Sequence, residues 1–144
     1  ERALHYEIYK ARSEVNAIVH AHSRYAIAFS SVSMELPVIC IELFFAGGPI
    51  PVAPYQCPGT REVGITAAFY FKKRPELKGL LLQNHGQVAI GNDLNEAYQM
   101  AYNVEIGAEI YHDALQTGKA PLVLSAEQIA DISRQYHLPR ALTR

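Results

Sequence analysis

The chain has 144 residues, of which 49% are hydrophobic, and this is enough to build one domain with its own core. Its 13 basic and 14 acidic side chains give a formal net charge of -1, and neither sign forms a long run. We therefore expect no nucleic-acid partner and no membrane partner. Cys40 and Cys57 are too few for a disulfide framework, which favours a cytoplasmic location.

The first half of the chain alternates helical and extended patterns. Residues 1–12 place apolar side chains at helical spacing, and residues 17–22 form an apolar strand. Residues 25–31 are predicted to form a short helix. The apolar runs at residues 38–41 and 50–53 predict two short buried strands.

The second half continues the alternation with longer helices. Residues 60–73 form an amphipathic pattern that Thr60 can cap, and two apolar strands are predicted at residues 79–83 and 87–90. The longest predicted helix covers residues 92–116. A last helix is expected at residues 126–136, where Ser125 precedes Gln128 by the spacing of a capping box.

Two histidines stand in the predicted strand, within the sequence IVHAHS. Side chains two residues apart on a strand project from the same face, so His20 and His22 share one face. Two imidazoles at this spacing can bind one metal ion, and a catalytic zinc usually has three protein ligands. Such a pair alone is also typical of a structural or surface feature, so the hypothesis needs a third ligand.

His85 is the candidate for that third ligand. Asn84, His85 and Gly86 join two predicted strands as a tight turn, in which Gly86 is free to adopt a positive φ angle. Pairing of the strands can aim His85 at the face that carries His20 and His22. A role in the turn alone is the alternative.

Three segments together resemble the class II aldolase and adducin superfamily, especially its fuculose-phosphate aldolase branch. They are ERALHYEIYKARSEVNAIVHAHS, LLLQNHGQVAIG and the start of a long helix at NEAY, and GGPIPVAPYQCPGTRE is similar as well. In that family an acidic residue precedes a helix that leads to a His-x-His strand, and a third histidine comes from an HHG or NHG turn. Glu1 precedes His20 by 19 residues, which matches the family's interval.

The resemblance implies a fold, a cofactor and a set of site residues. The implied fold is α/β, a three-layer α/β/α sandwich with a mainly antiparallel central sheet. His20, His22 and His85 would bind a catalytic Zn²⁺ or another divalent metal, and Glu1 falls on the family's catalytic carboxylate. Relatives are usually homotetramers with the site at a subunit interface, so we expect a homo-oligomer.

The function that the resemblance implies is reversible retro-aldol cleavage of a ketose. The expected substrate is a sugar phosphate such as fuculose 1-phosphate, and the products are a dihydroxyacetone-type fragment and an aldehyde. In this hypothesis the metal stabilises negative charge on oxygen, and Glu1 moves protons between a hydroxyl group and carbon.

Two departures from the family pattern bear on the site. Ile41 stands where fuculose-type aldolases carry a proton-donor tyrosine, so Glu42, Tyr136 or a residue from elsewhere takes that role, or the substrate differs. The half-domain that precedes the catalytic acid in the family has no counterpart here. We therefore expect residues 1–144 to be a single class II aldolase-type domain that lacks its N-terminal part, including the loops that bind the substrate phosphate.

Alternative functions remain open at this point. A sugar-phosphate 4-epimerase of the ribulose 5-phosphate type uses the same metal and the same retro-aldol step, but usually carries Asp where this chain has Glu1. Dehydratase and decarboxylase relatives are further candidates. A non-enzymatic module like the adducin head would bind no stoichiometric metal, and in a plain α/β domain the histidines would be structural.

Overall fold

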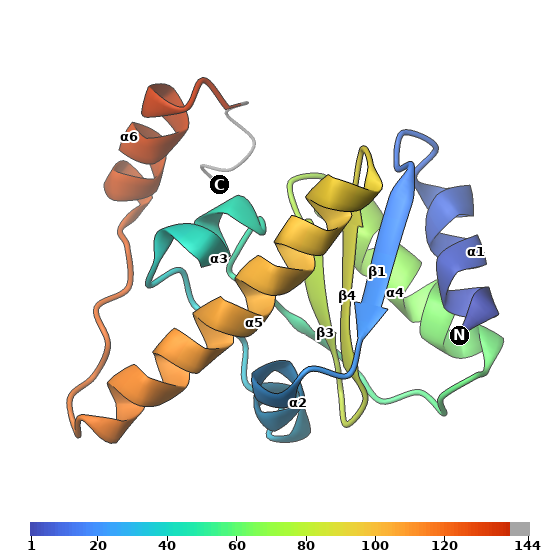
Figure 1. Ribbon diagram of the computed structural model, residues 1–144, viewed down its shortest axis with the longest axis horizontal. Coiled ribbons are helices and arrows are strands. Elements are labelled where there is room, and N and C mark those ends of the chain that lie inside the picture. Colours follow the sequence, from blue (N-terminus) through green and yellow to red (C-terminus); the bar gives the residue numbers. More distant parts are fainter. Residues whose placement is uncertain (139–144) are drawn as a thin grey trace.

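The computed structural model describes residues 1–138, so the last six residues of the predicted domain lie outside the described part. A four-stranded sheet with the order β1-β4-β3-β2 forms its centre (Figure 1). The strands are β1 (Ala17–Ala21), β2 (Val52–Ala53), β3 (Gly79–Leu82) and β4 (Gly86–Gly91). β1 and β3 both pair antiparallel with β4, and β2 runs parallel to β3. The prediction of a mainly antiparallel sheet is confirmed.

Helices cover both faces of this sheet, which confirms the three-layer α/β/α arrangement. They are α1 (Arg2–Ala11), α2 (Arg24–Ser31), α3 (Ile41–Phe45), α4 (Arg61–Lys73), α5 (Leu94–Gln116) and α6 (Ala126–Gln135). α1 and α4 pack together on one face, whereas α5 crosses the other face with α2 and α3 beside it (Figure 1). Among residues 1–138, no helix combines the length and the apolar character needed to cross a membrane.

The core fixes the sheet between the two helical layers. Every residue of β3 and β4 is buried, as expected for strands that are covered on both faces. Leu4 and Ile8 form the buried stripe of α1, one turn apart, and Phe71 of α4 is fully buried in the same core. The strand ends that carry the histidines therefore rest on a rigid base.

The helix starts follow the capping signals of the sequence. α5 begins at Leu94, slightly later than predicted, because Asp93 is its N-cap, whose side chain accepts a hydrogen bond of 2.8 Å from the backbone N–H of Glu96. Ser125 and Gln128 form the expected capping box at the start of α6. α4 begins directly after Thr60, as predicted, but the Thr60 side chain makes no capping bond and donates to the carbonyl oxygen of Cys57 instead.

The predicted strand at residues 38–41 is wrong. Val38 is buried, but its carbonyl accepts a hydrogen bond from the N–H of Leu124 rather than from a sheet neighbour, and α3 begins at Ile41. Leu43 anchors α3 on α5 at Gly107, where a Cβ atom would collide with the leucine side chain. A short buried apolar run cannot be assigned to a strand by hydrophobicity alone, because a short buried helix gives the same pattern.

The turn between β3 and β4 differs from the prediction in one detail. Asn84, and not Gly86, adopts the positive φ angle, at 56°. Gly86 is required for a different reason, because a Cβ atom there would lie 2.5 Å from the carbonyl oxygen of Ala21 on β1. The glycine thus allows β1 and β4 to approach closely beside the histidines.

Candidate metal centre

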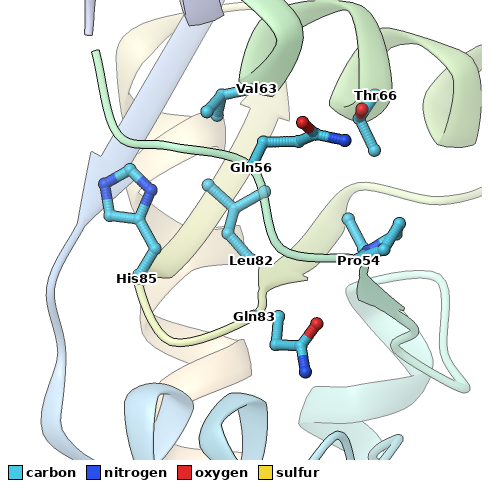
Figure 2. Close-up of a pocket in the computed structure, with 8 residues that line it drawn as sticks. Pro54, Gln56, Val63, Thr66, Leu82, Gln83 and His85 are labelled. Carbon is cyan, nitrogen blue, oxygen red and sulfur yellow. The ribbon is translucent and has the colours of Figure 1, made fainter. Parts of the chain in front are cut away.

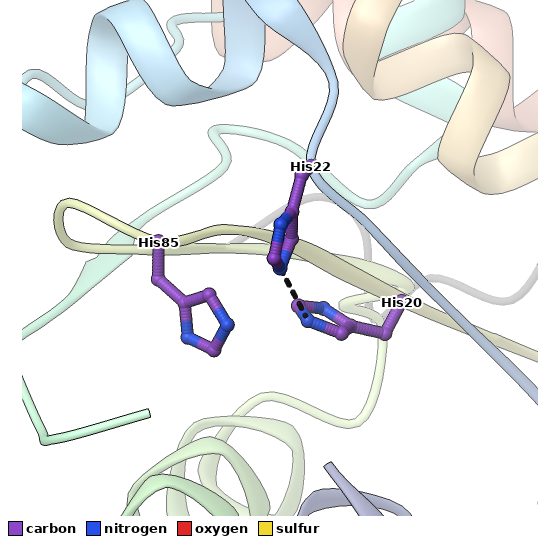
Figure 3. Close-up of side chains that lie close together, drawn as sticks. All are labelled: His20, His22 and His85. Atoms are coloured by element: carbon purple, nitrogen blue, oxygen red, sulfur yellow. Dashed lines mark hydrogen bonds between the residues drawn. The ribbon is translucent and has the colours of Figure 1, made fainter. Parts of the chain in front are cut away.

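Three histidine rings meet at one end of the sheet. His20 lies on β1, His22 follows the end of β1, and His85 lies in the turn before β4. The ring centroids are 4.8–5.0 Å apart, so the rings form a nearly equilateral triangle (Figure 3). One nitrogen from each ring lies within 4.8 Å of the other two. The geometry that the sequence predicted for these three residues is present.

A backbone hydrogen bond sets the orientation of His20. Its Nδ1 lies 2.7 Å from the carbonyl oxygen of Gln87, and a carbonyl oxygen only accepts, so Nδ1 carries the proton. In the neutral ring Nε2 then presents a lone pair, and it lies 3.2 Å from Nε2 of His22. This is the arrangement in which histidine usually binds a metal.

Burial keeps two of the rings neutral. It lowers the pKa of His20 below its ordinary value of 6.5, against the opposing effects of the Gln87 carbonyl and the Glu1 carboxylate. Burial also lowers the pKa of His85, and the Glu1 carboxylate again opposes it. Neutral imidazole is the form that donates a lone pair to a metal, so both rings are in the ligand form at neutral pH.

The Glu1 carboxylate lies beside the histidine triangle. Its two oxygen atoms are 3.4 Å from Nε2 of His20 and 3.5 Å from Nε2 of His85. The side chain is 44% exposed, in contrast to those of His20 and His85, which are 7% and 5% exposed. The carboxylate can therefore face a bound ion and the solvent at the same time.

The residues present fit a divalent cation. Nε2 of His85 is buried, and within residues 1–138 no hydrogen-bond partner satisfies it. Of the two facing nitrogens of His20 and His22, at most one can donate while both rings are neutral. A buried nitrogen without a partner costs free energy, and a cation at the centre of the triangle would satisfy all three rings.

A narrow hollow adjoins His85. Figure 2 shows it between β3, the start of α4 and the loop after β2, with Gln56, Thr66 and Gln83 as its polar side chains. Its free space of about 10 Å³ holds at most one water molecule. The hollow is therefore too small for a sugar, and the exposed side of the histidine triangle is the one where His22 and Glu1 lie.

The two candidate proton donors lie elsewhere in this chain. Tyr136 follows α6 and packs edge-on against Phe45, with ring centroids 5.1 Å apart. Glu42 belongs to the first turn of α3 and contacts Cys40. In the described part of the chain, neither forms a hydrogen bond or an ion pair with the histidine triangle.

Sequence reasoning missed one residue of the site, Gln87. Besides its carbonyl bond to His20, its side chain donates to Ser23 Oγ, directly after His22. The signal was a lone glutamine in a strand whose other residues are apolar or glycine, GQVAIG. A buried glutamine needs hydrogen-bond partners inside the protein, and Nε2 of Gln87 finds one in Ser23, beside His22, whereas its Oε1 has none among the described residues.

Comparison with known proteins identifies the family of this chain. A family model described as the class II aldolase and adducin N-terminal domain matches residues 1–112. The chain belongs to the class II aldolase and adducin family. It is similar to L-fuculose phosphate aldolase of Escherichia coli, with 36% identity over 137 residues, and to 5-deoxy-D-ribulose 1-phosphate aldolase of Bacillus thuringiensis, with 31% identity over 136 residues.

The family resemblance extends to the three-dimensional structure. A solved structure of L-fuculose 1-phosphate aldolase superposes with a TM-score of 0.85 at 31% sequence identity, and covers 94% of this chain. The chain spans 62% of the length of each of these three relatives, and 94% of the chain takes part in each match. The fold expected from the sequence is thus confirmed for this family member.

Proposed function

We propose that the protein is a divalent-metal-dependent aldolase that cleaves a ketose phosphate into a dihydroxyacetone-type fragment and an aldehyde. The observation that carries the proposal is the meeting of three histidine nitrogens beside the partly exposed carboxylate of Glu1. The similarity to proteins named as aldolases of sugar phosphates supports the same reaction class.

In this proposal His20, His22 and His85 hold the cation, and zinc is the metal that three imidazoles suit best. When bound, the cation supplies positive charge that stabilises the negative charge on the substrate oxygens as the carbon–carbon bond breaks. The three rings keep that charge undiminished, because each is a neutral ligand.

Glu1 moves the proton in the proposed mechanism. In the cleavage direction the substrate hydroxyl loses its proton, its oxygen becomes the carbonyl oxygen of the aldehyde, and the electron pair of the broken bond stays on the ketone fragment. That fragment then takes up a proton at carbon. An exposed carboxylate beside the histidines can carry a proton between the hydroxyl and this carbon.

The proposal includes a homotetramer in the cytoplasm. Glu42 and Tyr136 make no contact with the histidines of their own chain, so a role for either as the proton donor requires a second copy. The free cysteines Cys40 and Cys57 are consistent with a reducing compartment. The part of the relatives' length that this chain does not span is where we place the phosphate-binding groups.

Product analysis on the full-length protein tests the proposal. The protein is freed of metal with a chelator, reloaded with zinc, and incubated with fuculose 1-phosphate and 5-deoxyribulose 1-phosphate. We expect the ketone fragment and the aldehyde in equal amounts, with turnover lost on chelation and restored by zinc. An epimer without aldehyde would favour a 4-epimerase, and no conversion by the zinc-loaded protein would overturn the enzymatic proposal.

A further inference from the structure

His22 has the weakest support among the three histidines. It is exposed, and its one side-chain hydrogen-bond contact within residues 1–138 is with the ring of His20. It also lies between two elements, after the end of β1 at Ala21 and before the start of α2 at Arg24. The position of its ring therefore depends on what holds the backbone of residues 22–26.

Glu105 of α5 holds one side of this segment. Its two carboxylate oxygens accept hydrogen bonds of 2.9 Å from the backbone N–H groups of Tyr25 and Ala26. These N–H groups belong to the first turn of α2, where no carbonyl of the same helix can accept from them. A carboxylate at this helix end also interacts favourably with the helix dipole. Glu105 thus caps α2 from a different helix, and Ser23, the N-cap residue, makes no side-chain cap bond.

The Ser23 hydroxyl, which does not cap α2, accepts a hydrogen bond from Gln87. Nε2 of Gln87 donates to Ser23 Oγ at 2.7 Å and to the carbonyl oxygen of Ala101 on α5 at 3.0 Å. The residue is 1% exposed, so these bonds form in a dry environment where geometry is strongly fixed. Its carbonyl holds His20, and its side chain holds the residue next to His22.

We propose that Gln87 and Glu105 are positioning residues of the metal centre, which join the segment of His22 to β4 and α5 and so fix the histidine triangle. The inference rests on the proposed function, because it assumes that the triangle binds a divalent cation. Neither side chain touches the triangle directly. Outer hydrogen bonds of this kind orient metal ligands, and their loss typically weakens metal binding about 10- to 100-fold.

Gln87→Met tests the inference with little change in side-chain volume, and the backbone carbonyl that holds His20 stays. We expect the zinc dissociation constant to rise about 10-fold or more, and the visible absorption of the cobalt-loaded protein to change, because the His22 segment is no longer held. Glu105→Gln should weaken zinc binding less, since an amide still accepts one of the two hydrogen bonds.

Two variants on α5 serve as matched controls. Within residues 1–138 the Gln99 side chain bonds only to Asn103 of its own helix, so Gln99→Met makes the same substitution at an exposed glutamine that does not touch the site. Glu109→Gln removes a comparable carboxylate one turn beyond Glu105. Both should bind zinc like the wild type, with the same cobalt spectrum.

Ser23→Ala keeps the inference testable if Gln87→Met does not fold, because it removes the other end of the same hydrogen bond. The variant that combines Gln87→Met with Ser23→Ala should lose no more zinc affinity than the more strongly affected of the two single variants. Unchanged zinc affinity in Gln87→Met and Ser23→Ala, beside a wild type that binds zinc, would overturn this inference alone. A folded wild type without zinc binding would overturn it together with the metal site.

Discussion

The polar side chains at the two ends of the β1-β4-β3 sheet differ in how completely they are paired. At the end where Ala17 pairs with Gly91, Lys78 forms an ion pair with Glu96, whose second carboxylate oxygen accepts the N–H of Asn92 at 2.7 Å. Arg12 nearby donates to Glu14 and to the carbonyl oxygens of Phe71 and Pro75. These charged groups find complementary partners within the chain.

At the histidine end the pairing is less complete, although the Glu1 carboxylate lies 3.4 Å and 3.5 Å from the Nε2 atoms of His20 and His85. Nitrogen lies opposite nitrogen in His20 and His22, and the buried Nε2 of His85 has no hydrogen-bond partner among the described residues. Both ends use hydrogen bonds from neighbouring elements, but at the histidine end these bonds hold the His20 ring and the backbone of α2 and leave the buried Nε2 of His85 without a partner among the described residues. One end of the sheet thus contributes to stability, whereas the other carries ring nitrogens that a bound cation would satisfy.

The largest expected difference between the ends is catalytic. Glu1→Gln keeps the size of the side chain but cannot carry a proton, so turnover of a ketose phosphate should fall by about 100-fold or more. Glu96→Gln at the opposite end should leave turnover within about twofold, as expected for a residue that contacts no reacting group. Steady-state cleavage rates of the two variants measure this difference. Turnover at the wild-type rate in Glu1→Gln would contradict the catalytic role assigned to Glu1.

A pair of glycines on β4 separates effects on stability from effects on the site. A Cβ atom at Gly86 would lie 2.5 Å from Ala21 O and 3.1 Å from Cδ2 of His22, whereas one at Gly91 would lie 2.5 Å from the N atom of Ala97. Both alanine variants should lower the free energy of unfolding by about 1–3 kcal/mol, because each crowds backbone.

Only the Gly86→Ala variant should also weaken zinc binding, since only there does the added methyl group press on a histidine. Urea denaturation and zinc titration of the same samples measure the two effects. Equal zinc affinity in the two variants would show that the close approach of β1 and β4 at Gly86 does not matter for the metal.

The smallest expected effect concerns the ion pair of Lys78 and Glu96. Lys78→Met should lower the free energy of unfolding by at most about 1 kcal/mol at pH 7, because the lysine is partly exposed. Burial by itself would raise the pKa of Glu96, but its bonds to Lys78 and Asn92 outweigh burial and hold that pKa below the ordinary value of 4.5.

This shift fixes the pH range of the effect. A lowered pKa in the folded state contributes stability that is fully present above pH 4.5 and is lost as the pH falls through the folded-state value. The difference in unfolding free energy between wild type and Lys78→Met should therefore shrink below pH 4.5. A difference that stays constant from pH 7 to well below 4.5 would contradict the assigned cause.

Periodicity and capping signals predicted most of the fold. The long helix after Asp93 and the capping box at Ser125 are local features, so their sequence patterns suffice to locate them. The run at residues 38–41 failed because its structure is decided by a distant partner, the N–H of Leu124, and by the docking of α3 on α5. Tertiary contacts of this kind leave no local pattern.

The same distinction applies to the site. The spacing of His20 and His22 follows from strand geometry alone, and the turn at His85 has its own sequence signal. The hydrogen bonds of Gln87 and Glu105 could not be predicted, because they join β4 and α5 to a segment more than 60 residues away in the sequence. Only the assembled fold shows which buried polar groups meet.

Metal analysis of purified wild-type protein tests the central claim most directly, with His22→Ala and His85→Ala as site variants. His112→Ala is the control, because the partly exposed His112 ring contacts Asp113 and the ring of Tyr25 and does not contact the triangle. We predict close to one zinc ion per chain in the wild type and in His112→Ala, and a near-complete loss in both site variants. Folded wild-type protein that holds no metal after zinc is supplied, or site variants that retain it, would contradict the account.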